Sequence, residues 1–273
     1  LMAIIFDGRA FASQKESLLK LAVEKLKQKG KIPRLASILI GDNPASKLYV
    51  DLKKKAAEQI GVELDVYYLS HNKKTDEILK LIGSLNEDKE VDGIMIQLPL
   101  PEGLSKDKGR IIKTIDYKKD VDGLRPDSSF LHPTSKAVVE ILDRAELMLG
   151  KKPETICVIG ATGMVGTPLV KELKKKKYQV IECSSETKNL GDKTREADVL
   201  ISAIGKANLL KGHMVKDGAV VIDVGSPRGD VQLNEVTKKA SFITPVPGGV
   251  GPVTIACLLE NLVEACQEKK VSI

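Results

Sequence analysis

Residues 43–57 read NPASKLYVDLKKKAA and have the spacing of an amphipathic helix, for which Ser46 is the expected N-cap. A short apolar run at 35–40 comes before this helix and is typical of a buried strand. The same alternation continues along the chain, and it predicts an α/β protein with βαβ units and mostly parallel sheets. Strands are predicted at 35–40, 62–69, 93–96, 155–159, 179–183, 198–203 and 219–224, and helices at 13–30, 43–57, 75–86, 105–114, 134–149, 166–177, 192–196 and 253–269.

Tyr49 and Lys53 lie four residues apart in the helix at 43–57 and therefore on one face. Of three consecutive lysines, only Lys53 flanks the predicted apolar stripe, to which Leu52 and Ala56 contribute. A lysine that is half-buried against apolar side chains has a lowered pKa, because desolvation disfavours its charged form. Such a lysine suits acid–base chemistry. The alternative is a basic helix whose lysines extend into water, and the spacing alone favours that alternative.

The composition of the 273 residues, 42% hydrophobic and 29% charged, is that of a globular protein with one large or two modest domains. The net charge of +6 is spread along the chain, so we expect an anionic small-molecule ligand and no nucleic acid. Nothing resembles a membrane span or a signal peptide, and we expect a cytoplasmic protein with no membrane partner. The four cysteines lack CxxC pairs, which indicates reduced core residues and no metal site.

A glycine turn, Gly160-Ala161-Thr162-Gly163-Met164-Val165-Gly166, connects the strand at 155–159 to the next helix. Such a turn directs backbone N–H groups at a phosphate, although a packing turn also fits the spacing G-x-x-G-x-x-G. The following strands continue in the order of a nucleotide-binding half-sheet, and glycines follow two of them, at Gly205 and Gly225. The second half of the chain is therefore predicted to bind a nucleotide.

Ligands of parallel sheets gather at the carboxyl ends of strands, and Gln97 directly follows the strand at 93–96. Asp122, in the stretch KDVDG at 119–123, is either a functional carboxylate or a turn residue, and the residues alone favour the turn. The stretch TPVPGGVGP at 244–252 has a rigid, bare backbone that suits close approach to a flat ligand.

These stretches, in this order and with these gaps, resemble the bifunctional methylenetetrahydrofolate dehydrogenase/methenyltetrahydrofolate cyclohydrolase family over nearly the whole chain. The matching motifs are PAS-x-x-Y-x-x-x-K at 44–53, QLPLP at 97–101, KDVDG at 119–123, the glycine turn at 160–168, GAVVIDVG at 218–225 and TPVPGGVGP at 244–252. The resemblance implies an N-terminal folate domain at 1–133, completed by a C-terminal helix at 253–273, which faces a Rossmann-like nicotinamide-binding domain at 134–252 across a cleft. It also implies a homodimer.

The resemblance implies two reactions. Hydride passes from 5,10-methylenetetrahydrofolate to the nicotinamide, and water then converts 5,10-methenyltetrahydrofolate to 10-formyltetrahydrofolate. Lys53 is expected to move protons, and Gln97 to hold its amine. Tyr49 is expected to stack on the folate, and Asp122 to bind the pterin edge. The implied substrate-binding residues are Tyr49, Lys53, Gln97, Leu98, Pro99, Asp122, Pro247, Gly248, Gly249, Gly251 and Pro252. The implied cofactor-binding residues are Gly160, Ala161, Thr162, Gly163, Gly166, Ser185, Gly205, Ser226 and Thr254. No metal is implied.

The expected cofactor is NADP, with NAD as the alternative, because the chain departs from the family on the cofactor side. The family has Gly-Arg-Ser where this chain has Gly160-Ala161-Thr162, so the arginine expected to bind the 2′-phosphate of NADP is absent. Glu182, expected to end a strand, favours a free ribose hydroxyl and hence NAD. Ser185 instead matches a family serine expected near the 2′-phosphate. A cyclohydrolase with weak or NAD-preferring dehydrogenase activity is therefore the alternative function.

The chain also departs from the family before the helix at 134–149. The family has Pro-Cys-Thr-Pro-x-Gly there, whereas this chain has HPTSKA at 132–137. His132 has no counterpart in the family motif, and a capping or packing role is favoured over catalysis.

Overall fold

The computed structural model of the protein describes residues 3–268. They form two compact units, and each unit combines two separate parts of the chain. The six-stranded unit contains the residues up to 12 and 134–254. The three-stranded unit contains 13–133 and the described residues from 255 onward. Within residues 3–268, no helix has both the length and the apolar character that crossing a membrane requires.

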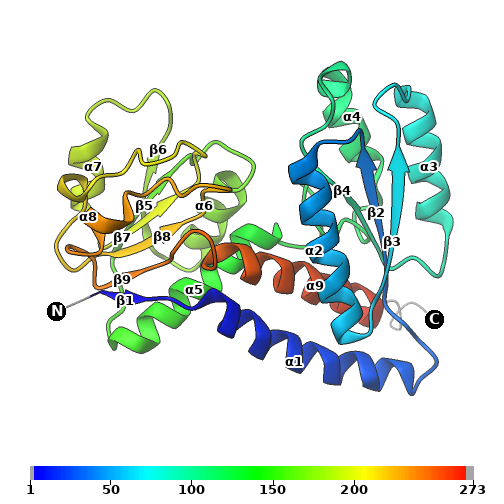
Figure 1. The fold of residues 1–273 in the computed structure, drawn as a ribbon, viewed down its shortest axis with the longest axis horizontal. Helices are drawn as coiled ribbons and strands as arrows, with labels where there is room; N and C mark the ends of the chain where they lie inside the picture. The colour runs from blue at the N-terminus through cyan, green and yellow to red at the C-terminus, as the bar shows by residue number, and fades with distance from the viewer. Residues whose placement is uncertain (1–2, 269–273) are drawn as a thin grey trace. The chain divides into compact units, whose positions relative to one another are not determined.

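The three-stranded unit has a parallel sheet in the order β3-β2-β4, with helices on both faces (Figure 1). Its strands are β2 (Arg34–Ile40), β3 (Glu63–Leu69) and β4 (Gly93–Ile96). Its helices are α1 (Gly8–Lys27) from residue 13 on, α2 (Pro44–Ile60), α3 (Thr75–Glu87), the 3-10 helix η1 (Glu102–Asp107), α4 (Lys108–Thr114) and α9 (Val250–Glu268) from residue 255 on.

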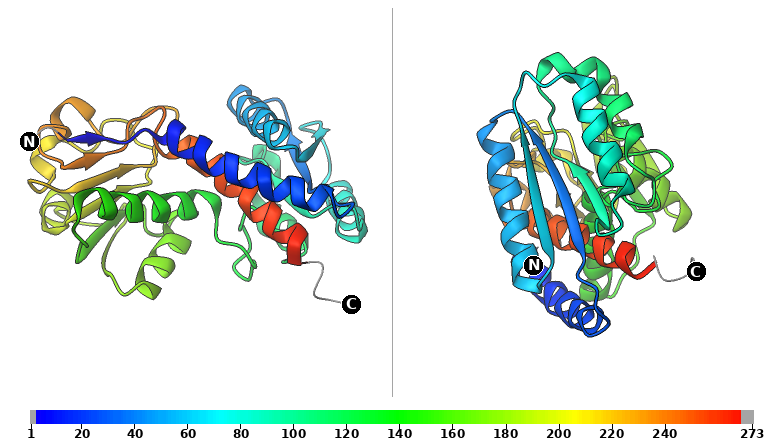
Figure 2. Two further views of the ribbon diagram at one scale, coloured as in Figure 1. Left: turned by 90° about the horizontal axis from the view of Figure 1, so that it is seen from below. Right: turned by 90° about the vertical axis from the view of Figure 1, so that its right-hand side faces the viewer.

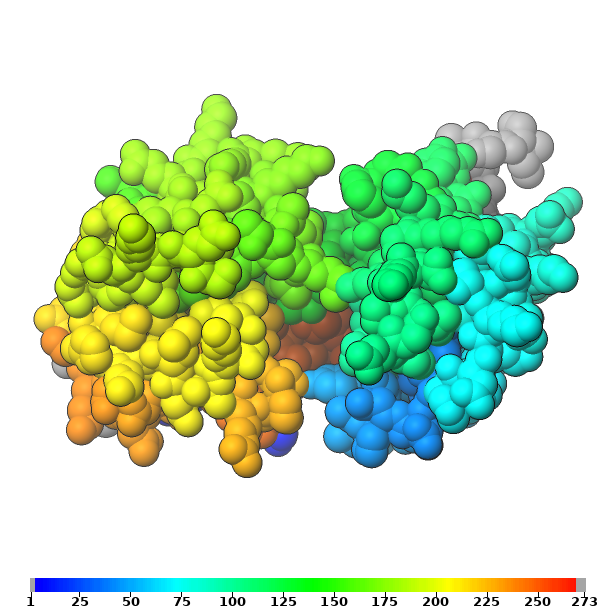
Figure 3. All heavy atoms as spheres, turned by 90° about the horizontal axis from the view of Figure 1, so that it is seen from above, coloured from blue at the N-terminus to red at the C-terminus, as the bar shows by residue number. Residues whose placement is uncertain are grey.

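Strand β2 is central in this sheet, and its alternating side chains enter two different hydrophobic cores. Leu35 packs with apolar residues of α1, α2 and α9, whereas Ala36 and Ile38 pack with residues of α3 and α4. Helices α1 and α9 run side by side in the left view of Figure 2, and an ion pair of 2.6 Å joins Lys15 to Glu260. Helices α3 and α4 lie next to each other on the surface of the unit, as the cyan and green spheres of Figure 3 show. The sheet is thus covered on both faces, as parallel sheets generally are.

The six-stranded unit has a parallel sheet in the order β1-β9-β8-β7-β5-β6 (Figure 1). Its strands are β1 (Ile4–Ile5), β5 (Thr155–Ile159), β6 (Gln179–Cys183), β7 (Val199–Ser202), β8 (Val220–Asp223) and β9 (Phe242–Ile243). Its helices are α5 (Pro133–Leu149), α6 (Gly166–Lys175), α7 (Leu190–Glu196), the 3-10 helix η2 (Gly212–Met214) and α8 (Leu233–Val236). From β5 the chain builds outward first to β6 and then to β7 on the other side. Doubly wound sheets bind their ligands at such a switch point.

The predicted α/β class with parallel sheets and two domains is confirmed, but several predicted boundaries differ from the structure. Residues up to 12 belong to the six-stranded unit, because β1 pairs with β9. Helix α2 is capped by Asn43 and not by Ser46, since Asn43 Oδ1 accepts a hydrogen bond of 3.0 Å from the Ser46 backbone N–H. Helix α9 begins at Val250, before the predicted start, and residues 269–273 of the predicted helix lie outside the described residues.

Candidate active site

Helix α2 presents Lys53 from the middle of its buried face. That face is formed by Ser46, Val50, Ala57, Ile60 and Ala56. Lys53 is half-buried, whereas the two lysines after it are exposed, as the helical spacing predicts. The exposure of Leu52 differs from the prediction: this side chain is 44% exposed, because it lies beyond the edge of the buried face. Tyr49 is half-buried one turn before Lys53.

The Lys53 amine meets two side chains from the carboxyl end of β4. Lys53 Nζ donates a hydrogen bond of 3.0 Å to Gln97 Oε1, and it lies 3.8 Å from the sulfur of Met95. Gln97 Nε2 donates to the carbonyl of Leu98 at 2.9 Å, which fixes the amide so that its oxygen faces the lysine. Pro99 follows through a cis peptide bond and is exposed. The structure thus joins Lys53 to Gln97, and it adds Met95, which the sequence did not single out.

The amine of Lys53 has a lowered pKa. The main cause is burial, which disfavours the ammonium, and the negative charge of Asp122 acts in the opposite direction. The nearest acceptor is a neutral amide rather than a carboxylate, so the hydrogen bond positions the amine without fixing it in the charged form. The lowered pKa favours the neutral amine, which is the form that accepts a proton.

The side chains of the KDVDG stretch have different roles: Lys119 and Asp120 bind the protein backbone, whereas Asp122 is open to a ligand. Lys119 is buried and donates to the carbonyls of Leu85 and Asp88 at 2.9 and 2.6 Å. Asp120 is fully buried and accepts the backbone N–H groups of residues 124 and 125 at 3.2 and 2.8 Å. Asp122 is half-exposed, and within the described residues no group donates a hydrogen bond to its carboxylate. Asp120 therefore fulfils the turn role that the sequence favoured for Asp122.

Two glycines of the turn after β5 stand where a side chain has no room. Gly160 has a φ of +85°, and a Cβ at this residue would lie 2.5 Å from the carbonyl of Ala203. A Cβ at Gly166 would lie 2.1 Å from the carbonyl oxygen of Gly160. Thr162 and Gly163 are exposed, and Ala161 is buried at 4% exposure. Helix α6 starts at this turn without a side-chain cap. The backbone N–H groups of Thr167 and Leu169 donate to the carbonyls of Gly163 and Val165, and Pro168 has no N–H group.

The other predicted cofactor residues of the sheet follow the carboxyl ends of neighbouring strands. Ser185, Gly205 and Ser226 follow β6, β7 and β8, and all three are exposed. The loops after β7 and β8 are organised by Asp230, which accepts hydrogen bonds from the Ser202 hydroxyl and from the backbone of Gly205 at 2.7 and 3.2 Å. Asp223 contributes in the same way, accepting from the backbone of residues 225, 230 and 231. Neither aspartate had been singled out from the sequence.

Glu182 occupies a different position from the one predicted. Strand β6 ends at Cys183, so Glu182 is not its last residue. Its carboxylate pairs with Lys174 of α6 at 2.5 Å, and both side chains are substantially exposed. The expectation that this carboxylate lies where a ribose hydroxyl binds is therefore not supported by its position.

The predicted substrate residues near the end of the chain are not in the three-stranded unit. Pro247, Gly248 and Gly249 belong to a loop of the six-stranded unit. Gly251 and Pro252 lie in the first turn of α9, and Thr254 lies one turn further on. The loop backbone is tightly packed, since a Cβ at Gly249 would lie 2.5 Å from the carbonyl of Pro245. The substrate residues implied by resemblance are thus divided between the two units.

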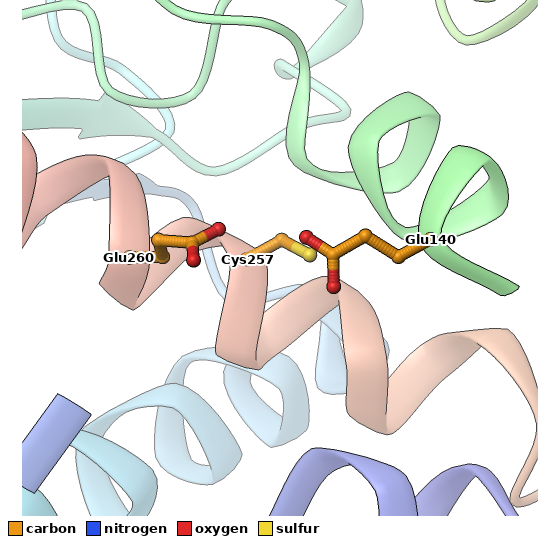
Figure 4. A group of neighbouring side chains, drawn as sticks. All are labelled: Glu140, Cys257 and Glu260. Atoms are coloured by element: carbon orange, nitrogen blue, oxygen red, sulfur yellow. The ribbon is translucent and has the colours of Figure 1, made fainter. Parts of the chain in front are cut away.

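Figure 4 labels three potential metal ligands, Glu140 of α5 with Cys257 and Glu260 of α9. Glu260 is already paired with Lys15 at 2.6 Å within the three-stranded unit. Glu140 belongs to the six-stranded unit, whereas Cys257 and Glu260 belong to the three-stranded unit. The three side chains do not form a ligand set within one unit, and we assign no metal site to them.

Two family models match the chain, one in its first half and one in its second half. The model of the tetrahydrofolate dehydrogenase/cyclohydrolase catalytic domain matches residues 6–122. The model of the NAD(P)-binding domain of the same family matches residues 132–270.

Individual relatives match over nearly the whole length. The bifunctional protein FolD of Lactobacillus helveticus is 42% identical, and the match covers 96% of this chain and 97% of the relative. The crystal structure of the bifunctional enzyme FolD from Campylobacter jejuni has a TM-score of 0.90 at 42% identity, covering 96% and 98% of the two chains. The Trypanosoma brucei enzyme, solved with NADP and an inhibitor, has a TM-score of 0.92 at 32% identity, covering 100% of both chains.

Proposed function

Because this chain belongs to the tetrahydrofolate dehydrogenase/cyclohydrolase family, we propose that it catalyses both reactions of that family. It oxidises 5,10-methylenetetrahydrofolate to 5,10-methenyltetrahydrofolate with a nicotinamide dinucleotide. It then hydrolyses the product to 10-formyltetrahydrofolate.

The observation that carries this proposal is the Lys53–Gln97 pair. In the hydrolysis step, water adds to the methenyl carbon and loses a proton, and a carbon–nitrogen bond of the ring then breaks. The methenyl centre is cationic, so a neutral amine beside it avoids charge repulsion and accepts the proton of the water. The lowered pKa of Lys53, caused by burial, favours the neutral amine. The hydrogen bond of 3.0 Å to Gln97 directs the amine.

Tyr49 and Asp122 bind the substrate in this proposal. The carboxylate of Asp122 has no hydrogen-bond donor within the described residues, so its two oxygens are available to the adjacent N–H donors of a pterin edge. Tyr49 lies one helical turn from Lys53 and is half-buried, a position from which its ring stacks on a flat ligand. The family resemblance assigns the same substrate-binding role to Leu98 and Pro99, and also to Pro247, Gly248, Gly249, Gly251 and Pro252.

The glycine turn binds the dinucleotide in this proposal, and that cofactor supplies the hydride acceptor. The residues fit a diphosphate, because Gly160 and Gly166 carry no side chain and leave the backbone of the turn open to close approach. Ala161, Thr162 and Gly163 complete the turn. Ser185, Gly205 and Ser226 follow the next strands of the sheet, and Thr254 contributes from α9.

We assign NADP as the preferred cofactor. Ser185 is exposed just after β6, and the charge of Glu182 is compensated by Lys174. Replacing Ser185 with aspartate is expected to raise the KM for NADP and to lower the ratio of NADP to NAD activity, because a carboxylate repels the 2′-phosphate. Glu182→Gln is expected to leave that ratio unchanged. A ratio that shifts in Glu182→Gln and not in Ser185→Asp would contradict this assignment.

A two-cofactor assay tests the function as a whole. Methenyltetrahydrofolate formation is followed with NADP and with NAD, and the hydrolysis of added methenyltetrahydrofolate is followed separately. We expect both reactions, with NADP as the better oxidant. Hydrolysis without reduction of either cofactor would support the alternative, a cyclohydrolase with weak dehydrogenase activity, which the buried Ala161 favours. The family resemblance also motivates a homodimer, which analytical ultracentrifugation tests.

A further inference from the structure

His132 is a buried imidazole whose backbone touches the segment that carries Asp122. Its side chain is 8% exposed, and it directly precedes α5, which starts at Pro133. A Cβ at Gly123 would lie 2.6 Å from the backbone nitrogen of His132 and 2.8 Å from its Cα. Only a glycine fits there, and its φ is +59°. The residue after Asp122 is therefore packed directly against His132.

A single buried side chain holds the two segments together. Asn261 of α9 donates from Nδ2 to the carbonyl of Val121 at 2.9 Å and to the carbonyl of Leu131 at 3.0 Å. Each carbonyl belongs to the residue just before Asp122 or His132. Asn261 is 1% exposed, so these hydrogen bonds are shielded from water. The backbone segments that carry Asp122 and His132 are consequently held next to each other.

Two charged side chains act electrostatically on the imidazole. Burial is the main influence and lowers the pKa of His132, Asp122 opposes this effect, and Lys53 reinforces it. The same aspartate opposes the lowering of the pKa of Lys53. The imidazole, the amine and the carboxylate therefore influence one another electrostatically, and burial favours the neutral form of the imidazole.

We propose that His132 is a positioning residue of the folate site, whose neutral imidazole leaves the Asp122 carboxylate available to the substrate and whose protonated form competes for that carboxylate. This inference rests on the proposed function. Its consequence is that folate binding weakens in acid, because a second cation then faces Asp122. The effect falls on the binding of folate, while the chemistry at Lys53 keeps its own pH dependence.

Folic acid, which has a pterin edge and does not react, is a suitable probe for isothermal titration calorimetry between pH 5.5 and 8. In the parent protein, we expect the Kd to rise roughly threefold to tenfold toward the acid end of this range, because the protonated fraction of the imidazole grows as the pH falls. In His132→Gln, we expect a Kd that does not depend on acid, since the amide keeps a polar side chain without a titratable charge. His71→Gln, an exposed site in the same unit, is the matched control.

Nuclear magnetic resonance of the histidine rings tests the same inference without a ligand. The chain has three histidines, so the His132 signal is assigned by its loss in His132→Gln. In Asp122→Asn, we expect the titration midpoint of His132 to fall, because the carboxylate that favours its charged form is removed. The ring signals of His71 and His213 serve as the internal reference in the same spectra.

Two results would overturn the inference. One is an acid-dependent Kd that persists in His132→Gln, and the other is a His132 midpoint that does not respond to Asp122→Asn. A parent protein that neither binds folic acid nor hydrolyses methenyltetrahydrofolate would instead refute the proposed function, and this inference with it.

Discussion

Replacing Gln97 with glutamate tests the proposed role of Lys53 most directly. The substitution exchanges a neutral oxygen for a carboxylate at the end of the 3.0 Å hydrogen bond to Lys53 Nζ. At an effective dielectric constant of about 20, unit charges separated by 3.0 Å attract by about 5 kcal/mol, which is an upper limit for the stabilisation of the ammonium. Even a third of that energy lowers the fraction of neutral lysine by a factor of roughly ten or more.

The pH profile of methenyltetrahydrofolate hydrolysis measures this effect. In Gln97→Glu, we expect the rate at pH 7 to fall roughly tenfold or more and to recover as the pH rises, because alkaline pH restores the neutral amine. In Gln97→Leu, the hydrogen bond is lost without a new charge. The rate should then fall by a pH-independent factor of about five to ten, which corresponds to one hydrogen bond.

Gln59→Glu is the control for the added charge. Gln59 lies on the same helix and is exposed, so its substitution changes the net charge equally without approaching the amine. Its pH profile should match that of the parent. If the profile of Gln97→Glu were lowered equally at every pH, Lys53 would not be the group whose neutral form accepts the proton.

Three further changes give independent outcomes. Asn261→Leu leaves the carbonyls of Val121 and Leu131 without their Nδ2 donor. We therefore expect the free energy of unfolding in urea to fall by about 2–4 kcal/mol and the KM for folate to rise. Unchanged values would contradict the role of Asn261 in holding these two segments together. Gly166→Ala places a Cβ 2.1 Å from a carbonyl oxygen in the glycine turn, so NADP binding by fluorescence titration should weaken at least roughly tenfold while folic acid binding persists. Lys216→Met removes the main cause that lowers the pKa of Asp198 to about 2. A lowered carboxyl pKa stabilises the folded state fully above about pH 4, and this stabilisation is lost as the pH falls toward 2. The free energy of unfolding of the variant should therefore be lower by about 1 kcal/mol at pH 7 and unchanged at pH 2.

The strands of both sheets were predictable from sequence because apolar runs of four to seven residues produce a clear pattern. The exceptions are β1 and β9, which have two residues each, too few to show a periodicity. Their pairing is the reason that the residues up to 12 join a different unit from the one expected. Boundaries of this kind depend on tertiary pairing and cannot be derived from a local pattern.

The site was predictable to different degrees for different residues. Lys53 stood out by its helical spacing, and Gln97 by its place after a strand. Asp122 required the family resemblance, because a local reading could not tell it from Asp120, which forms the turn.

Asn261 gave no signal in the sequence at all. Its partners lie 140 and 130 residues away along the chain, so only the folded structure brings them together. A role for His132 follows only from two features of the folded structure. One is its backbone contact with Gly123, and the other is the pair of hydrogen bonds from Asn261 to the residues that precede Asp122 and His132.

The place of α9 in the chain has a consequence for biosynthesis. Leu258, Leu259 and Leu262 are almost fully buried in the core that α1 and α2 share, and each contributes about 1.5–3 kcal/mol when removed from water. This helix is the last described element to leave the ribosome. The core of the three-stranded unit is therefore complete only after residues 134–254 of the six-stranded unit have been synthesised. A nascent chain that ends before residue 255 should remain dependent on chaperones, however well its first strands have paired.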